Sequence, residues 1–277
     1  LVEKAKDTFS LSPLPDTYSI KVVRGEGGKI AKFTIMQPEG EFGFKPAGTT
    51  KIAMTVDELY TKALAASGGE ANWRKLTSRV TISAFDLEQQ GVKGTATSWS
   101  KAPNLTATET KMTAIGKEIA TGWEFFDGSG GEQLYSFAPA DKYTGKRLED
   151  MKLTADFYSM LDWKAKYKTI SISRIAKVGE EEAYVVDFEP EKGSKFSDYY
   201  STKTFLLLKR EGSVPSSTSS ISTPYTMRFE DYRDVDGVKI SFKQVNNTPG
   251  NGDIVTVLTS VKHNVAIDDK VFAPRKL

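Results

Sequence analysis

The chain has 277 residues, with 38 Lys and Arg against 36 Asp and Glu, one histidine and no cysteine. The missing cysteine excludes thiolate nucleophiles, disulfides and cysteine zinc sites, and the single histidine excludes metal sites that need several histidines. With 39% hydrophobic residues the chain can bury a sizeable core. Its nearly balanced, interleaved charges do not form the basic surface that binds nucleic acid.

The first 50 residues read as a small β subdomain followed by a linker. Residues 18–23 and 30–35 are rich in β-formers, and the glycines of residues 24–29 suit a hairpin turn between them. A third, weaker strand is predicted at residues 41–44, and residues 46–50 read as a linker. The sequence therefore predicts a subdomain over residues 1–50 and a larger domain over residues 51–277. The charged first seven residues lack the apolar stretch of a signal peptide, so we expect any targeting sequence to be removed or upstream.

The clearest helix signal opens the larger domain. Thr55 stands three residues before Glu58, which is the spacing of a capping box. Apolar side chains then recur at helical spacing on one face, at Val56, Leu59, Tyr60, Ala63 and Leu64. Gly68 and Gly69 are predicted to end this helix, and residues 70–76 to form a second, shorter one.

From residue 78 onward the hydrophobic pattern turns to the period of strands. About ten strands separated by turns are expected, which favours an antiparallel meander. A helix capped by Thr154 is predicted to interrupt them, with Phe157, Met160 and Leu161 on one side. Residues 202–209 are predicted to form a strand and residues 212–224 a loop. We therefore expect a mainly β fold with few helices, in which a large curved antiparallel sheet or incomplete β-barrel wraps around two or three helices.

Candidate catalytic patterns are weak. Ser98 and Lys101 match the S-x-x-K spacing of serine acylases, but the serine lies in a strand pattern and the partner motifs of such enzymes are missing. The glycine-rich residues 25–28 and 128–131 fit hairpin turns better than phosphate loops. Neighbouring carboxylates such as those of residues 180–182 point to opposite faces of a strand, so they favour a solvated edge. His263 alone predicts a hydrogen-bonded residue more readily than a metal ligand, and neither a metal nor a cofactor is predicted.

Large apolar side chains are the remaining candidates for a site. A wide sheet covered by few helices can leave part of its concave face unfilled, and such a cavity would take a lipid or another apolar ligand. The alternative is that these side chains simply form the core. The candidates are Trp99, Trp123, Phe125, Tyr135, Phe157, Leu161, Tyr184, Phe188, Phe205, Met227 and Phe229.

The order of elements and several motifs resemble the outer-membrane lipoprotein-sorting (LolA/LolB-like) superfamily over about residues 55–275. The motifs are Ala-Ala-Ser-Gly-Gly-Glu-Ala at 65–71, Phe-Asp-Gly at 126–128, the turn region 231–240 and the ending 264–272. The resemblance implies an incomplete β-barrel around helices, with an apolar cavity that shields acyl chains. The segment at about residues 12–46 is similar to a small β tail of β-lactamase-type serine hydrolases. That second resemblance implies that the chain continues a longer polypeptide whose catalytic residues lie upstream.

Two main functions follow as expectations. The first is a non-enzymatic protein of the periplasm or another exported location in the cell envelope, whose partner is a lipid or other hydrophobic molecule in an apolar cavity. The second is an accessory domain of an exported serine hydrolase or peptidase, which would be fused upstream. A third possibility is a hydrolase that uses Ser98 and Lys101 itself. Neither a nucleic-acid partner nor a transmembrane segment is expected, because the longest aliphatic run, residues 205–208, is far shorter than the roughly 20 residues that a membrane span needs.

Overall fold

The structure is a computed structural model that describes residues 2–11, 13–44, 52–216 and 222–277. Contacts between residues divide the chain into two units, residues 1–51 and 52–277. The predicted linker at residues 46–50 lies outside the described residues.

The first unit is a five-stranded antiparallel sheet in the order β1-β2-β3-β4-β5. Its strands are β1 Val2–Ala5, β2 Thr8–Ser10, β3 Ser19–Arg24, β4 Ile30–Gln37 and β5 Gly40–Phe44. The predicted hairpin is confirmed as the pair of β3 and β4, joined through a short 3-10 helix, Glu26–Gly28, in which Gly27 has a φ of 67°. The strands β1 and β2 were not predicted. They have only four and three residues, with charged residues among and beside them, which is too short for an alternating hydrophobic pattern to be recognised.

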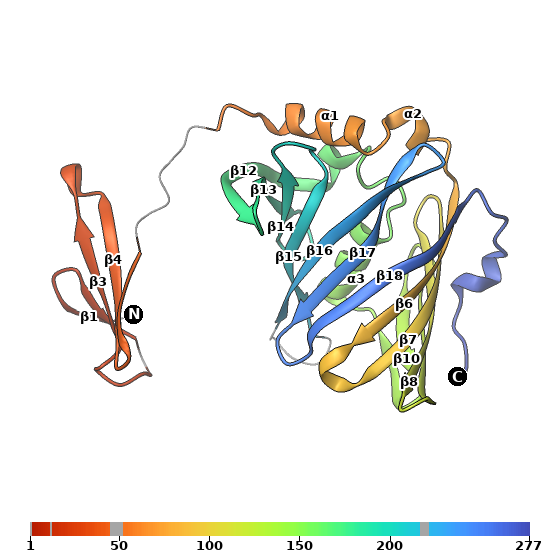
Figure 1. Ribbon diagram of the computed structural model, residues 1–277, viewed down its shortest axis with the longest axis horizontal. Helices are drawn as coiled ribbons and strands as arrows, with labels where there is room; N and C mark the ends of the chain where they lie inside the picture. Colours follow the sequence, from red (N-terminus) through yellow and green to blue (C-terminus); the bar gives the residue numbers. More distant parts are fainter. Residues whose placement is uncertain (1, 12, 45–51, 217–221) are drawn as a thin grey trace. The chain divides into compact units, whose positions relative to one another are not determined.

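The second unit is built on a thirteen-stranded sheet in the order β11-β10-β9-β8-β7-β6-β18-β17-β16-β15-β14-β13-β12. Every pair is antiparallel, and the edge strands β11 and β12 do not pair with each other, so the sheet is not closed into a barrel. Figure 1 shows that it curves, with α3 on its concave side. The prediction of a mainly β fold with a large curved antiparallel sheet is confirmed.

The strands of this sheet are given in chain order. They are β6 Ser78–Leu87, β7 Val92–Lys101, β8 Leu105–Ala114, β9 Lys117–Phe126, β10 Gly131–Tyr135, β11 Ala138–Lys142, β12 Tyr167–Val178, β13 Glu181–Pro190, β14 Phe196–Ser201, β15 Leu207–Pro215, β16 Ser222–Val235, β17 Val238–Thr248 and β18 Gly252–His263.

The helices of the second unit are α1 Val56–Ala66, α2 Glu70–Trp73 and α3 Gly145–Thr154, with 3-10 turns at Glu88–Gln90, Trp163–Lys166 and Asp269–Phe272. The capping box predicted before α1 is confirmed. The Thr55 hydroxyl accepts a hydrogen bond from the Glu58 N–H at 3.2 Å, and the Thr55 N–H donates to the Glu58 carboxylate at 2.8 Å. None of the helices in the described part of the chain has the length and apolar character to cross a membrane.

The helix predicted to start at Thr154 is wrong, since Thr154 is the last residue of α3. The residues that follow form turns, because the Asp156 carboxylate accepts the Tyr158 N–H at 2.9 Å and draws the backbone out of a helical path. The charged sequence of α3, Gly145–Thr154, offers little apolar stripe, which is why the helix was missed.

Two predicted segments around β15 also need correction. Residues 202–206 form a turn, and the strand expected over residues 202–209 begins at Leu207. The loop expected over residues 212–224 is strand at both ends, where Ser213 pairs with Pro224 and Val214 with Thr223. Cross-strand pairing outweighs the serine-rich composition there, and residues 217–221 lie outside the described residues.

The two faces of the large sheet are covered differently. We call the face that meets the helices the inner face. On it, Leu59 and Tyr60 of α1 pack on Val186 and Phe188 of β13, and a second cluster gathers around Val238, Ile240 and Phe242 of β17. On the opposite, outer face of β7 to β9, the C-terminal segment covers Trp123 and Phe125 with Phe272, which is 4% exposed.

Candidate ligand-binding site

The inner face of the central strands holds apolar side chains outside the hydrophobic core. Cross-strand register places Met227 and Phe229 of β16, Phe85 of β6 and Met112 of β8 on this face, in line with the inner-face clusters of β13 and β17. All four side chains are half-buried, and none belongs to a hydrophobic cluster of the described residues. They therefore expose apolar surface inside the curve of the sheet.

Three aromatic rings lie flat on the inner face instead of standing up from it. Each ring covers a glycine of the neighbouring strand, and a Cβ atom built on that glycine would come within 3.0 Å of the ring. The missing side chain is what leaves room for the ring. The pairs are Phe85 over Gly94, Tyr135 over Gly122 and Tyr225 over Gly212. The rings belong to β6, β10 and β16, which do not neighbour one another in the sheet, and each occupies little of the space above its own pair of strands. We refer to the three rings together as the aromatic floor.

Polar groups of the inner face are mostly satisfied. Asp198 of β14, 2% exposed, accepts two hydrogen bonds from Arg210 of β15 at 2.6 and 2.8 Å. Burial lowers the pKa of the Arg210 guanidinium, but the neighbouring Asp198 carboxylate outweighs it and the net pKa is raised. The two hydrogen bonds of this ion pair fix the position of β14 against β15.

His263 lies at the end of β18 with its side chain 1% exposed. Its Nδ1 atom is 3.0 Å from the Asp236 carboxylate, while its Nε2 atom is buried and has no hydrogen-bond partner within the described residues. Burial lowers the pKa of His263, the hydrogen bond to Asp236 raises it, and the positive charge of Arg79 lowers it again, with a net decrease. The expectation of a hydrogen-bonded residue agrees with this geometry, and no cluster of three metal-ligating side chains occurs in the described ranges.

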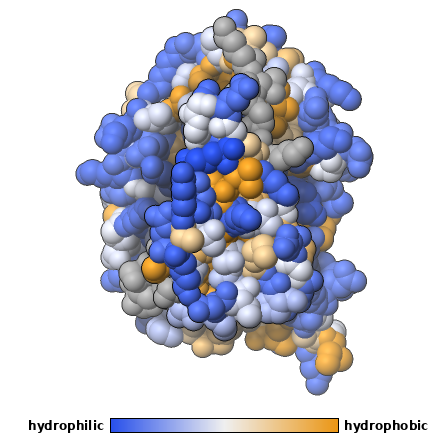
Figure 2. Space-filling model, turned by 90° about the vertical axis from the view of Figure 1, so that its left-hand side faces the viewer, coloured by the Kyte–Doolittle hydropathy of each residue, from blue (hydrophilic) through white to orange (hydrophobic). Residues whose placement is uncertain are grey.

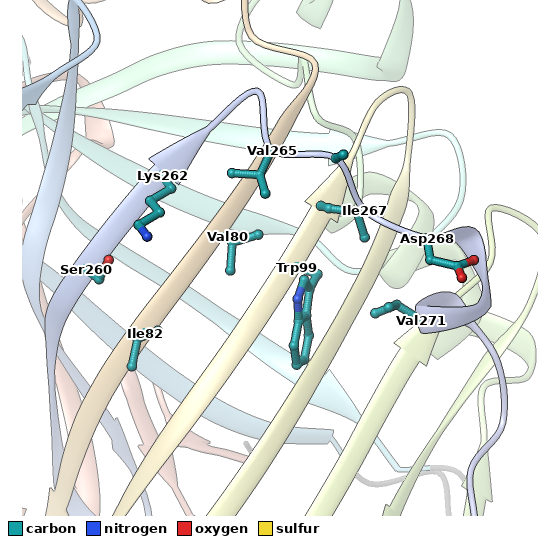
Figure 3. Close-up of a pocket in the computed structure, with 10 residues that line it drawn as sticks. Val80, Ile82, Trp99, Ser260, Lys262, Val265, Ile267, Asp268 and Val271 are labelled. Carbon is teal, nitrogen blue, oxygen red and sulfur yellow. The ribbon is translucent and has the colours of Figure 1, made fainter.

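A second apolar surface is a groove on the outer face, with a volume of about 330 Å³. Its floor is Val80 and Ile82 of β6 and Trp99 of β7, and its wall is the C-terminal segment from Val265 to Val271. Figure 3 shows the Trp99 indole directed into this groove, with Lys262 at one end and Asp268 at the other. The groove is of the size that small ligands occupy.

The structure divides the predicted cavity residues among separate places. Trp99, Trp123 and Phe125 lie on the outer face with the C-terminal segment, whereas Phe188, Tyr184 and Phe205 lie in or against the inner-face cluster under α1. Phe157 packs against the cluster around Val238, and Leu161 is a half-buried residue of the turn after it. Tyr135, Met227 and Phe229 lie half-buried on the inner face, outside the hydrophobic clusters of the described residues. The single cavity that the list implies is thus not formed by all eleven residues together.

Sequence reasoning missed Phe85, Tyr225 and Met112 on the inner face. In β6, Val80 and Ile82 share one face and Phe85 lies on the other, and the alternation alone suggests that the face of Val80 and Ile82 is the core face. In the structure, Val80 and Ile82 instead line the groove on the outer face.

The candidate acylase pair is split between the faces. Ser98 lies on the inner face and accepts a hydrogen bond from Thr108 at 3.0 Å, whereas Lys101 lies on the outer face and pairs with Asp269 at 2.6 Å. A lysine on the other side of the sheet cannot take the proton of the serine. In the turn after β9, the Asp127 carboxylate accepts the N–H groups of Ser129 and Gly130 at 2.8 Å, which leaves those donors unavailable to a phosphate.

No protein-family model matches the chain, and no curated protein matches its sequence. Solved structures with a similar fold include a DUF1329 family protein from Desulfovibrio piger, at 12% identity and a TM-score of 0.51, which covers 79% of this chain and 97% of that one. A LolA superfamily protein from Nitrosomonas europaea, at 13% identity and a TM-score of 0.49, covers 80% and 99%. Lipoprotein LppX of Mycobacterium tuberculosis, at 12% identity and a TM-score of 0.28, covers 77% and 99%.

The chain shares the fold of the DUF1329 protein. At 12% identity the likeness shows the fold alone. The resemblance of about residues 12–46 to a serine-hydrolase tail finds no support in these comparisons.

Proposed function

We propose that residues 52–277 are a non-enzymatic binding domain of a cell-envelope protein, and that it holds a lipid or similar hydrophobic ligand on the inner face of the curved sheet. The observation that carries the proposal is the aromatic floor, together with the half-buried Met227 and Phe229 that belong to no core cluster. The sequence resemblance to the lipoprotein-sorting superfamily implies the same class of ligand and the same location.

The driving force would be removal of apolar surface from water. Each methylene of an acyl chain that becomes buried contributes about 0.8 kcal/mol. A chain of roughly ten buried methylenes therefore supplies on the order of 8 kcal/mol before the entropic cost of association is subtracted, so micromolar binding requires a longer buried chain or further contacts. Flat rings suit such a ligand, because they offer a wide apolar contact without the loss of rotamer freedom that long aliphatic side chains suffer.

The test is a titration of delipidated protein with N-phenyl-1-naphthylamine, an uncharged fluorescent probe, followed by displacement with monoolein. Substitutions Phe229→Gln and Met227→Gln each place an amide on the apolar surface, and we expect each to weaken binding about tenfold. Both side chains lie outside the core clusters, so the fold should persist.

The matched control is Ile82→Gln, which makes the same kind of change in the outer-face groove, at a residue that is 43% exposed. We expect it to leave binding within about twofold of wild type, as surface changes usually do. Loss of binding in Ile82→Gln alone would move the site to the groove. Delipidated protein that binds no apolar probe, and native protein that releases no lipid on extraction, would refute the proposed function.

A second candidate, an accessory domain of a longer hydrolase, draws on the small sheet. In it, Val23, Ile30, Phe42 and Phe44 are 43–47% exposed, and Thr34 and Ser10 are the buried residues. Apolar side chains spread on a sheet with little core of its own fit a segment that packs against another domain. Figure 2 shows orange, hydrophobic side chains scattered among mainly hydrophilic ones on the face of the molecule that it draws. The reading frame upstream of residue 1 decides this candidate, since a hydrolase domain must be encoded there.

A further inference from the structure

A row of four polar side chains crosses the inner face at one end of strands β18, β6, β7 and β8. Register pairs His263 with Arg79, Arg79 with Ser100, and Ser100 with Thr106. Side chains directly opposite each other on one face of a sheet have Cβ atoms about 5 Å apart. The four side chains therefore form one continuous polar strip.

Arg79 is half-buried in this strip, and it makes no hydrogen bond or ion pair within the described part of the chain. Its guanidinium lies over the Phe157 ring, whose centroid is 5.8 Å from Cζ. Phe157 is held there because its N–H donates to the Pro103 carbonyl at 2.9 Å. Burial lowers the pKa of Arg79, and no carboxylate offsets the effect. The guanidinium of this half-buried residue is therefore left without a protein partner for its charge.

The neighbours of Arg79 are unsatisfied too. The Nε2 atom of His263 and the Oγ1 atom of Thr106 are both buried without a hydrogen-bond partner. The Asp236 carboxylate is bound to the opposite ring atom of His263, Nδ1, at 3.0 Å and is 59% exposed. With Nδ1–H given to Asp236, the Nε2 atom of a neutral ring accepts a hydrogen, and a protonated ring donates one. Two buried polar atoms without a partner and one unpaired positive charge therefore lie in a single strip. The Arg79 guanidinium and the Thr106 hydroxyl can donate to an anionic oxygen, and His263 can do so when its ring is protonated.

We infer that the strip of Arg79, Ser100, Thr106 and His263 is a binding site for a carboxylate or phosphate group, and that this group is the head of the hydrophobic ligand. The second part rests on the proposed function. Arg79 and Phe85 lie on the same face of β6, six residues apart, which is about 20 Å along a strand. A head group at Arg79 therefore allows a long acyl chain to extend along the inner face over the Phe85 ring.

The experiment compares amphiphiles that share one chain and differ in the head group. Oleate, oleoyl lysophosphatidate and uncharged monoolein each displace N-phenyl-1-naphthylamine from delipidated full-length protein, and inorganic phosphate is titrated separately by calorimetry. We expect the two charged amphiphiles to bind roughly 10- to 100-fold more tightly than monoolein, as hydrogen bonds to charged groups do. The Arg79→Gln variant should lose that preference and still bind monoolein like wild type.

Two further variants test whether the preference depends on the strip itself. Lys262→Gln removes the same charge one residue from His263, on the outer face, and should keep the preference for charged amphiphiles. Thr106→Val removes a buried hydroxyl that has no partner at nearly constant volume, and should weaken the charged amphiphiles several-fold. Thermal unfolding of the ligand-free proteins checks the fold: Arg79→Gln should melt no lower than wild type, because it removes an unpaired half-buried charge.

The outcomes separate the two proposals. If the protein binds monoolein but shows no preference for charged amphiphiles, the anion site is overturned and the proposed function stands. The same conclusion follows if the preference for charged amphiphiles persists in the Arg79→Gln variant. Phosphate bound in an Arg79-dependent way, without binding of any amphiphile, supports the site as one for a free anion and refutes the lipid. Binding of neither phosphate nor amphiphile overturns both.

Discussion

At the scale of single residues, His263 is the side chain whose protonation we expect to affect stability near neutral pH, because it is the one histidine of the chain. Its pKa in the folded protein is lowered, first by burial, so the folded state binds its proton less readily than the unfolded chain does. The stabilising contribution of a neutral His263 is therefore present above the unfolded pKa of about 6.5 and is lost as pH falls below it.

We accordingly expect the free energy of unfolding to fall between pH 7.5 and pH 5.5, with a slope of at most about 1.4 kcal/mol per pH unit from this one proton. Urea denaturation at the two pH values measures it. The His263→Gln variant, which cannot take up the proton, should show a flatter dependence over the same range. Equal slopes in the two proteins would contradict the assignment to His263.

Residue-scale chemistry was the part of the site that sequence reasoning could treat least well. Ser98 and Lys101 have the S-x-x-K spacing in the sequence, but their side chains are not close in the structure. Residues three apart in a strand point to opposite faces of the sheet. Arg79 could not be singled out at all. One arginine among 38 basic residues becomes notable when the fold shows that no carboxylate reaches it.

At the scale of elements, the C-terminal segment after β18 acts as the cover of the outer face. Phe272 is 4% exposed against Trp123, and the Trp123 indole N–H donates to the Ala273 carbonyl at 3.0 Å. Arg275 stacks over the same indole, with its Cζ atom 3.6 Å from the ring centroid. Trp123, a predicted cavity residue, is thus enclosed by the chain's own C-terminal segment.

This packing predicts a large effect for one substitution. Phe272→Ala should lower the free energy of unfolding by about 3–5 kcal/mol, because it opens a cavity beside Trp123, and the tryptophan emission should shift to the red as water enters. Urea denaturation followed by fluorescence measures both effects. The control Phe137→Ala removes an aromatic side chain that is 71% exposed and should change stability by less than about 0.5 kcal/mol. A loss in Phe272→Ala as small as the loss expected for Phe137→Ala would show that Phe272 does not anchor the C-terminal segment.

Element prediction succeeded where local chemistry and burial agree. Thr55 and Glu58 specify the start of α1 by themselves, and the strands of β16 to β18 have turns such as Asp236-Gly237 between them. It failed where tertiary contacts decide. The charged α3 is held through Asp150, which accepts the Ser194 hydroxyl at 2.7 Å, a contact 44 residues away in the chain that no local pattern reveals.

At the scale of the whole molecule, the thirteen-stranded sheet was predictable as a class and its two faces were not. Strand alternation says which residues share a face, but the choice between inner and outer face depends on where the helices and the C-terminal segment pack. In the structure, the predicted cavity residues Trp99, Trp123 and Phe125 lie on the outer face. The predicted cavity residues Met227, Phe229 and Tyr135 lie on the inner face. The proposed function follows this division into a core under the helices, an outer face packed by the C-terminal segment at β7 to β9, and half-buried apolar side chains on the inner face.

The six methionines of the chain test this division most directly. In a protein labelled at the methionine methyl groups, Met227 and Met112 report on the inner face, whereas Met36 lies in the small sheet. Methionine-to-leucine variants assign the signals, and indole N–H signals report on Trp99 in the groove.

Titration with oleate, followed by methyl and indole NMR of one sample, is the decisive measurement. We predict that the Met227 and Met112 methyl signals shift with a common saturation curve, while the Met36 methyl and the Trp99 indole signals stay in place. A shift of the Trp99 signal with unchanged Met227 and Met112, or the absence of any shift at saturating oleate, would contradict ligand binding on the inner face.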